Sequence, residues 1–207
     1  MNSRFILATL LAVIIFGVQA NAQNEKKVTP VIEIGAGLSV EADSGYGECV
    51  KGLATELSLG LDIRIDDKWS VMPQIGLNAM LGDAWYLFRG YIGADYDVYS
   101  FYNASVLGRY RLEDGIAIGF GPAVYITEGE NTYYIDADPF DPRDGLVKIK
   151  PWDIGVRASL TKDYGKHWSI GILTNIGLRD MLYQYPDVGI TGHTHLFSLC
   201  LTVGYRF

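Results

Sequence analysis

Apolar and polar residues alternate along several stretches of the chain, most regularly over its last eleven residues. From Phe197 to Phe207 every second residue is large and apolar, while the residues between them are small, polar or charged. The stretch from Leu53 to Ile65 repeats this pattern over a longer span. Because successive side chains of a strand point to opposite faces, a period of two predicts β-strands with one continuous apolar face.

The same alternation predicts eight strands whose connections alternate in length. The expected strands span about 30–40, 53–65, 69–81, 99–112, 116–127, 149–161, 167–178 and 195–207. Three connections are tight and rich in turn residues, at 66–68, 113–115 and 162–166. The other four are long, at 41–52, 82–98, 128–148 and 179–194. An up-and-down meander of this kind has one plain end and one end that carries long loops.

Bacterial transmembrane barrels have an even number of antiparallel strands, short periplasmic turns and longer extracellular loops. Lipid cannot satisfy an open sheet edge, so the first and last strands of such a sheet must pair. We therefore expect an all-β fold, an eight-stranded antiparallel up-and-down transmembrane β-barrel. If the tight turns face the periplasm, one lipid-facing parity carries aromatic residues near both rims: Trp69, Tyr110, Trp168, Tyr205 and Phe207 at the periplasmic rim, and Tyr102, Trp152 and Phe197 at the outer rim.

The N-terminal sequence indicates the compartment. It has a basic Arg4, an apolar run over residues 5–18 and a small-residue site that ends at Ala22. This is the pattern of a secretory signal peptide over residues 1–22. The apolar run is shorter than the roughly 20 residues of a membrane-spanning helix. We expect a short linker at 23–29, a barrel over 30–207, and export to the bacterial outer membrane.

Charge and cysteine content exclude other classes. The formal net charge of −7 gives no basic footprint for a nucleic-acid partner. Only two cysteines are present, so the chain is not a disulfide-stapled secreted miniprotein. We expect Cys49 in the first long loop and Cys200 in the lumen, too far apart to form a disulfide.

The terminal sequence TVGYRF, with Val203, Tyr205 and Phe207 at alternate positions, resembles the C-terminal signal that outer-membrane assembly machinery recognises. The chain as a whole resembles the small eight-stranded outer-membrane barrels of the OmpA/OmpX type, in particular the PorT-like barrel-domain proteins of Bacteroidetes. The resemblance implies that the assembly machinery and outer-membrane lipid are partners. It implies no cofactor.

Charged residues of both signs fall on the parity that faces the lumen. An eight-stranded barrel is just wide enough for side chains to fill it, and buried charges persist when they are paired. We therefore expect a polar plug, with a gated ion path as the alternative. The predicted lumen charge network is Glu33, Glu56, Asp62, Arg64, Arg109, Arg111, Asp153, Arg157 and Arg206.

Catalytic and metal sites are not expected. His193, His195 and Ser198 are the candidates for a lipid-modifying enzyme, but His195 has outward parity and Ser198 inward parity. The acidic loop 128–148 is rich in oxygen ligands, yet its spacing does not match the helix–loop–helix calcium pattern. Its acidic residues are Glu128, Glu130, Asp136, Asp138, Asp141 and Asp144.

These features favour a non-enzymatic integral outer-membrane β-barrel. Its long loops would contact an extracellular ligand or a membrane protein partner, because side-chain variety is concentrated in those connections. A small pore or channel and a lipid-modifying outer-membrane enzyme are the alternatives.

Overall fold

The computed structural model describes residues 28–43, 49–81, 98–127, 132–134, 146–148, 150–180 and 194–207. The predicted signal peptide, His193 and most of the predicted long loops lie outside these residues. In the part of the chain that is described, no helix has the length and hydropathy needed to cross a bilayer.

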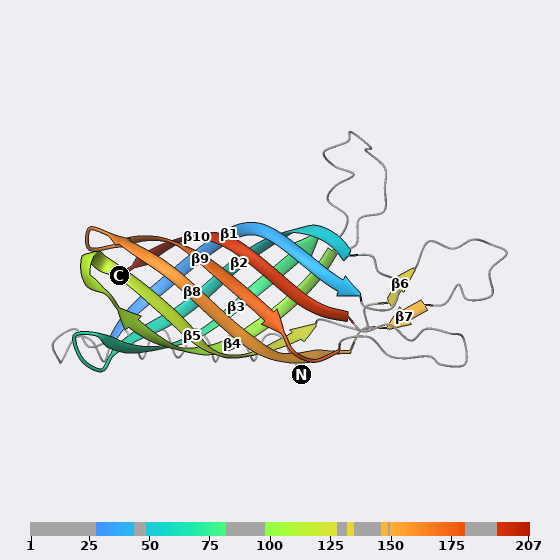
Figure 1. Cartoon of the computed structure of the whole chain (residues 1–207), viewed down its shortest axis with the longest axis horizontal. Helices are drawn as coiled ribbons and strands as arrows, with labels where there is room; N and C mark the ends of the chain where they lie inside the picture. The colour runs from blue at the N-terminus through green and yellow to red at the C-terminus, as the bar shows by residue number, and fades with distance from the viewer. Residues whose placement is uncertain are drawn as a thin grey trace, which may run out of the picture.

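Eight antiparallel strands close into a barrel in the order β1-β10-β9-β8-β5-β4-β3-β2 (Figure 1). Strands that follow one another along the wall are paired, and the barrel closes where β1 pairs with β10. The register of this closing pair runs from Val31↔Arg206 to Asp43↔Thr194. The predicted fold class is therefore confirmed. The strands are β1 (Val28–Asp43), β2 (Cys49–Arg64), β3 (Trp69–Leu81), β4 (Val98–Arg111), β5 (Ile116–Thr127), β8 (Trp152–Tyr164), β9 (Trp168–Gly177) and β10 (Thr194–Arg206).

The three tight connections lie together at one end of the barrel, which we call the turn rim, and the C-terminus lies beside them (Figure 1). The opposite end, where the long connections leave the wall, is called the loop rim. A two-stranded sheet of β6 (Thr132–Tyr134) and β7 (Leu146–Lys148) lies within the third long connection. The alternation pattern did not predict this hairpin.

Two strands extend further toward the loop rim than the sequence pattern predicts. β1 and β2 stay paired as far as Ala42↔Cys49, so Cys49 stands at the start of β2 and not in a loop. The prediction ended where apolar alternation ended, but backbone pairing continues beyond that point. Cys200 is free, and its partner on β1 is Gly37. The two pairing positions, Gly37 and Ala42, are five residue steps apart on β1, or about 16 Å along the strand, which is too far for a disulfide.

The turn between β2 and β3 is held by a side chain. The Asp66 carboxylate accepts the backbone N–H of Lys68 at 2.8 Å and that of Trp69 at 2.7 Å. These two hydrogen bonds hold the pKa of Asp66 below its usual range. The turn after β4 is a single 3₁₀ turn, η1 (Glu113–Gly115), in which Asp114 and Gly115 have φ of 65° and 74°. Asp66 and η1 thus fix two of the chain reversals at the turn rim.

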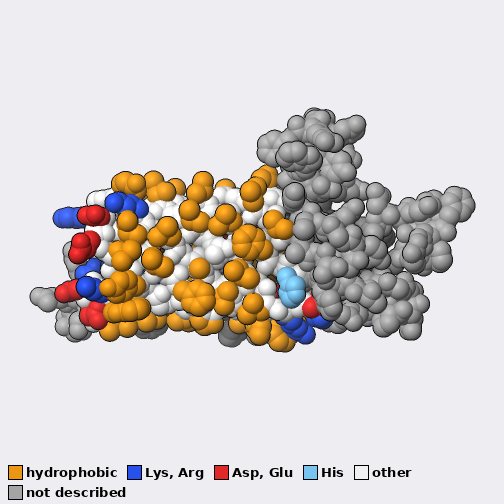
Figure 2. All heavy atoms as spheres, in the orientation of Figure 1, with side chains coloured by type: hydrophobic (Ala, Val, Ile, Leu, Met, Phe, Trp, Pro, Cys, Tyr) orange, Lys and Arg blue, Asp and Glu red, His pale blue; other side chains and the backbone are white. Residues whose placement is uncertain are grey.

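The two faces of the wall differ in chemistry. Outward-facing residues such as Ile34, Phe120 and Leu201 are large, apolar and 61–69% exposed. They form a continuous apolar belt on the face shown in Figure 2, where Lys, Arg, Asp and Glu side chains gather only at the two ends. The residues that alternate with them point into the lumen and are buried. A belt of this kind suits the hydrocarbon core of a bilayer, about 25 Å tall in outer-membrane barrels.

Candidate functional site

The lumen is filled with side chains in layers, and β4 passes through all of them. From the turn rim its inward residues are Arg109, Leu107, Ser105, Asn103 and Phe101, each at most 5% exposed. From the turn rim to the loop rim, these residues take part in a charged layer, an apolar collar, a central polar layer and an apolar cap. Buried side chains of β4 therefore occupy the lumen at each of these levels.

An ion pair between Glu56 and Arg157 forms the central layer. Arg157 also donates to the side-chain oxygens of Asn103 at 3.2 Å, Asn175 at 3.4 Å and Ser58 at 3.4 Å. Asn175 in turn donates to Glu56 at 3.0 Å. All five residues are at most 4% exposed. The pair therefore lies within a polar cage contributed by β2, β4, β8 and β9.

A second group of charges closes the lumen near the turn rim. Asp62 pairs with Arg109 at 3.1 Å and with Arg111 at 2.5 Å. Beside them Arg206 of β10 pairs with Asp163 of β8 at 2.5 Å. Arg109 is 1% exposed and Asp62 is 3% exposed. Burial without these partners would be costly, so the ion pairs account for the charged residues at this level.

Two apolar layers separate and cover the charged layers. The collar, next to Arg109, consists of Val31, Met72 and Leu107. The cap, toward the loop rim, consists of Met80, Phe101, Ala123, Tyr125 and Leu196. The collar thus separates the two charged layers, and the cap covers the central one.

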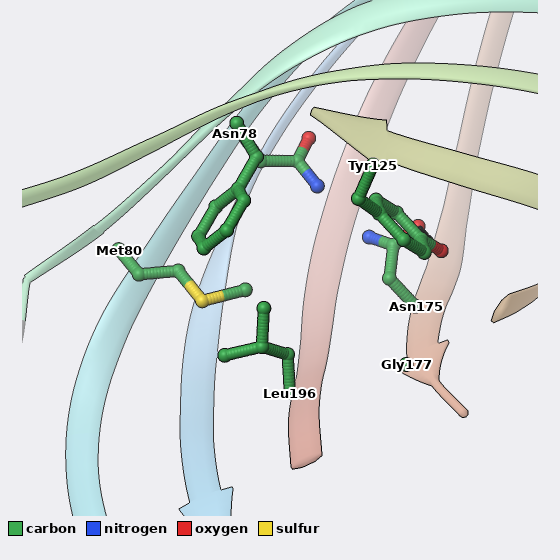
Figure 3. A pocket seen from close by; sticks show the side chains of 7 residues that line it. Asn78, Met80, Tyr125, Asn175, Gly177 and Leu196 are labelled. Carbon is green, nitrogen blue, oxygen red and sulfur yellow. Dashed lines mark hydrogen bonds between the residues drawn. The ribbon is translucent and has the colours of Figure 1, made fainter. Parts of the chain in front are cut away.

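A small cavity lies beneath the cap. Figure 3 shows Met80 and Leu196 on one side of it and Tyr125 and Asn175 on the other. Asn78, Phe101 and Gly177 complete its lining. Its volume of about 10 Å³ is what a single water requires by this measure. The cavity thus has room for a water and not for an organic ligand.

The remaining predicted lumen residues differ in their surroundings. Glu33 accepts a hydrogen bond from Gln74 at 2.8 Å. Asp153 is fully buried and accepts the backbone N–H of Arg179 at 2.9 Å. Arg64 is exposed, and no ion pair joins it to another described residue. It is the last residue of β2 at the turn rim, where water can solvate its charge, so it lies outside the plug that the sequence led us to expect.

Several members of the plug were not predicted. Asp163 was placed in a turn because KDYGK is rich in turn residues, but β8 continues to Tyr164. Asp163 lies an even number of residues after Arg157 and therefore on the same inward face of β8. This shared parity is the signal that could have identified Asp163 as a lumen residue. Asn103, Asn175 and Ser58 share the inward parity as well, and including uncharged polar residues in the parity argument would have found them.

The candidates for catalysis are not brought together. Ser198 is 1% exposed in the lumen, where its Oγ accepts a hydrogen bond from Asn175. His195 is exposed on the opposite face of β10. His193 and the acidic residues of the loop 128–148 lie outside the described residues. Within the described ranges, no three His, Cys, Asp or Glu side chains gather in a way that could hold a metal.

Aromatic rings occupy outward positions at the turn rim. The ring centroids of Trp69 and Tyr110 are 4.8 Å apart. The ring centroid of Tyr205 lies 5.0 Å from that of Trp168 and 5.1 Å from that of Phe207, and both contacts are edge-on. The alternating residues of the terminal motif therefore face outward, Val203 at 50% exposure and Phe207 at 65%.

At the loop rim the outward-facing aromatic residues are Tyr102, Trp152 and Phe197. Trp152, at the start of β8, is 44% exposed. Both rims thus carry aromatic rings on the outward face, as expected for the interfaces of a membrane barrel.

No protein-family model matches the sequence, and no curated protein matches it significantly. Among solved structures, Neisserial surface protein A (NspA) is similar, with 12% identity and a TM-score of 0.59 over 86% of this chain and 97% of that one. Ail, the attachment invasion locus protein of Yersinia pestis, in complex with the heparin analogue sucrose octasulfate, has 12% identity and a TM-score of 0.50 over 87% of this chain and 99% of Ail. The chain therefore has the fold of the small eight-stranded outer-membrane β-barrels.

Proposed function

We propose that this chain is a non-enzymatic integral protein of the bacterial outer membrane. Its plugged barrel would hold long loops in place for contact with an extracellular ligand or a membrane protein partner. One observation carries the proposal: the same eight strands expose an apolar belt outward and close the lumen with paired charges. Such a wall is suited to anchoring in lipid, which leaves the connections at the loop rim for recognition.

The packed lumen argues against the pore. Arg109, Arg157, Phe101, Leu107 and Leu173 come from β4, β8 and β9, and each is at most 2% exposed. Barrels that leave an aqueous channel have about 16–18 strands. The separation of Ser198 from His195 argues against the enzyme, because a nucleophile needs its base within hydrogen-bond reach.

The orientation and family belong to the same proposal. Short turns face the periplasm in barrels of this type, so the turn rim would be periplasmic and the loop rim extracellular. The signal peptide at 1–22 would direct export, and the motif of Val203, Tyr205 and Phe207 would be read by the assembly machinery. Membership of the PorT-like barrels of Bacteroidetes rests on the pattern resemblance and on this motif.

Refolding in detergent tests the anchoring role. We expect a folded, heat-modifiable band on a gel and, in planar bilayers, no stepwise conductance. Stable open channels in the unmodified protein would replace the proposal with a pore. Lipid A mass spectrometry of cells with and without the protein gives a separate check, and a change in acylation that depends on the protein would replace it with an enzyme.

A further inference from the structure

β8 and β9 bring two basic side chains together beside an outward-facing tryptophan at the loop rim. The guanidinium of Arg179 lies 4.0 Å from the centroid of the Trp152 ring. Lys150, two residues before Trp152, donates through Nζ to the carbonyl of Asp180 at 2.7 Å. β8 begins and β9 ends at this rim, so the topology places both cations at the upper edge of the apolar belt. We call Lys150, Trp152 and Arg179 the basic rim cluster.

The backbone around Arg179 is anchored to the barrel wall. Its N–H donates to the fully buried carboxylate of Asp153 at 2.9 Å, and its side chain donates through Nη1 to the carbonyl of Trp152 at 3.3 Å. A guanidinium has five N–H donors. These contacts fix the position of the group, and among the described residues they leave most of its donors for a further acceptor.

Charges of both signs surround the cluster. Neither Lys150 nor Arg179 forms an ion pair with another residue in the described ranges. Two carboxylates belong to this part of the rim: that of Asp153, which accepts the backbone N–H of Arg179 and points into the lumen, and that of Asp180, the next residue in the chain.

The surroundings of the cluster on the wall are apolar. Ile154 is 50% exposed and Leu178 is 57% exposed, both outward. Trp152 pairs with Ile126 of β5, which is 43% exposed. Basic groups directly above an apolar wall match an amphiphile whose anionic headgroup lies at the rim and whose chains lie along the strands.

We propose that the basic rim cluster binds the phosphate of an anionic glycolipid in the outer leaflet, with its acyl chains against Ile126, Ile154 and Leu178. Arginine forms strong charge-assisted bonds to phosphate, and a tryptophan face stabilises a neighbouring cation. The apolar wall selects a lipid phosphate over free phosphate. This inference rests on the proposed outer-membrane location, with the loop rim outermost.

Native mass spectrometry of the refolded full chain in detergent tests this directly, with bis-phosphorylated lipid A as the probe. The Lys150→Gln, Arg179→Gln double variant removes both cations. The control is Lys162→Gln, which removes an outward-facing cation from the other end of β8, near the turn rim. We expect the double variant to bind lipid A about tenfold more weakly, as befits two lost charge-assisted contacts. The control should bind as the wild type does.

Two further ligands identify what the cluster recognises. Dephosphorylated lipid A should bind the wild type about as weakly as phosphorylated lipid A binds the double variant, and inorganic phosphate should not compete. Equal binding by wild type and double variant, or an equal loss in the control, would overturn the proposal. Full competition by inorganic phosphate would replace the lipid with a soluble anion. A folded, heat-modifiable wild type that retains no lipid A would refute this inference alone, whereas failure to fold into a barrel would refute the proposed function as well.

Discussion

The lumen and the outward face of this barrel are built from the same eight strands, yet they depend on their residues in different ways. On β10, Leu201 is 69% exposed on the outward face and its neighbour Thr202 is 4% exposed in the lumen. In the proposed membrane location the outward face needs only that its side chains be apolar, because lipid has no fixed geometry to match. The lumen needs specific partners, because each buried charge must meet its opposite. A substitution on the outward face should therefore lower stability when it introduces a polar or charged side chain. A substitution in the lumen should lower stability when it removes the partner of a buried charge.

The largest effect should come from breaking the central ion pair. Replacing Arg157 by Met leaves Glu56 buried without its partner, and breaking a buried pair in this way costs about 3–5 kcal/mol. Urea unfolding of the protein refolded in lipid vesicles would measure the loss.

The double variant Glu56→Gln, Arg157→Met is the control for that prediction. Removing both charges should recover most of the lost stability, because the cost lies in the unpaired charge and not in the missing contact. If the double variant were as unstable as Arg157→Met, the pairing account of the lumen would be wrong.

A charge on the outward face should have the next largest effect. Leu201→Arg places a guanidinium against lipid near the middle of β10, at a cost of about 2–4 kcal/mol. Leu201→Ala, which changes size and not charge, should cost much less in the same unfolding experiment. Equal losses for the two variants would mean that this face packs against protein and not lipid.

The terminal aromatic residue should affect stability less but assembly more. Phe207→Ala removes an edge-on contact with Tyr205, worth about 0.5–1.5 kcal/mol beyond its buried area. If the terminal motif is an assembly signal, the amount of protein in the outer-membrane fraction should fall severalfold. Tyr110→Ala loses a comparable contact with Trp69 and should reach the membrane normally. Similar membrane levels for both variants would count against the signal.

The smallest effect should come from the turn held by Asp66, which belongs neither to the lumen nor to the outward face of the wall. The carboxyl should titrate below the usual aspartate range, because its ionised form accepts two backbone N–H groups. A lowered pKa in the folded state means that the turn is supported above the ordinary aspartate pKa and loses this support as the pH falls through the folded value. A carbon-detected NMR titration in micelles would measure this, and Asp66→Asn should abolish the response. Titration of Asp66 in the ordinary range would contradict the prediction.

The sequence predicted the strands and their facing because both follow from local alternation. β3 and β5 have the predicted bounds. Trp152 faces outward and Ser198 faces the lumen, as their positions in the alternation predicted. Boundaries were less accurate in β1 and β2, because backbone pairing continues past the last residues that alternate between apolar and polar.

The sequence could not predict which charges meet across the lumen. Glu56 and Arg157 lie on strands that are not neighbours, and their contact depends on how far the strands are staggered around the barrel. Parity places both residues inside but says nothing of their heights. The neighbouring Asn103 and Asn175 carry no charge, so a search for opposite charges passed over them.

The ladder between β1 and β10 has a further consequence for how the chain folds. Every other ladder of the wall joins strands that are consecutive around the meander, whereas this one joins Val31 to Arg206. Contacts between residues so distant in sequence form late, because the entropy of closing a long loop must be lost before any pairing compensates for it. We therefore expect hairpins such as β2–β3 and β8–β9 to form first and the closing ladder last. Until that step, both edges of the sheet stay unpaired, and another strand could add to either of them.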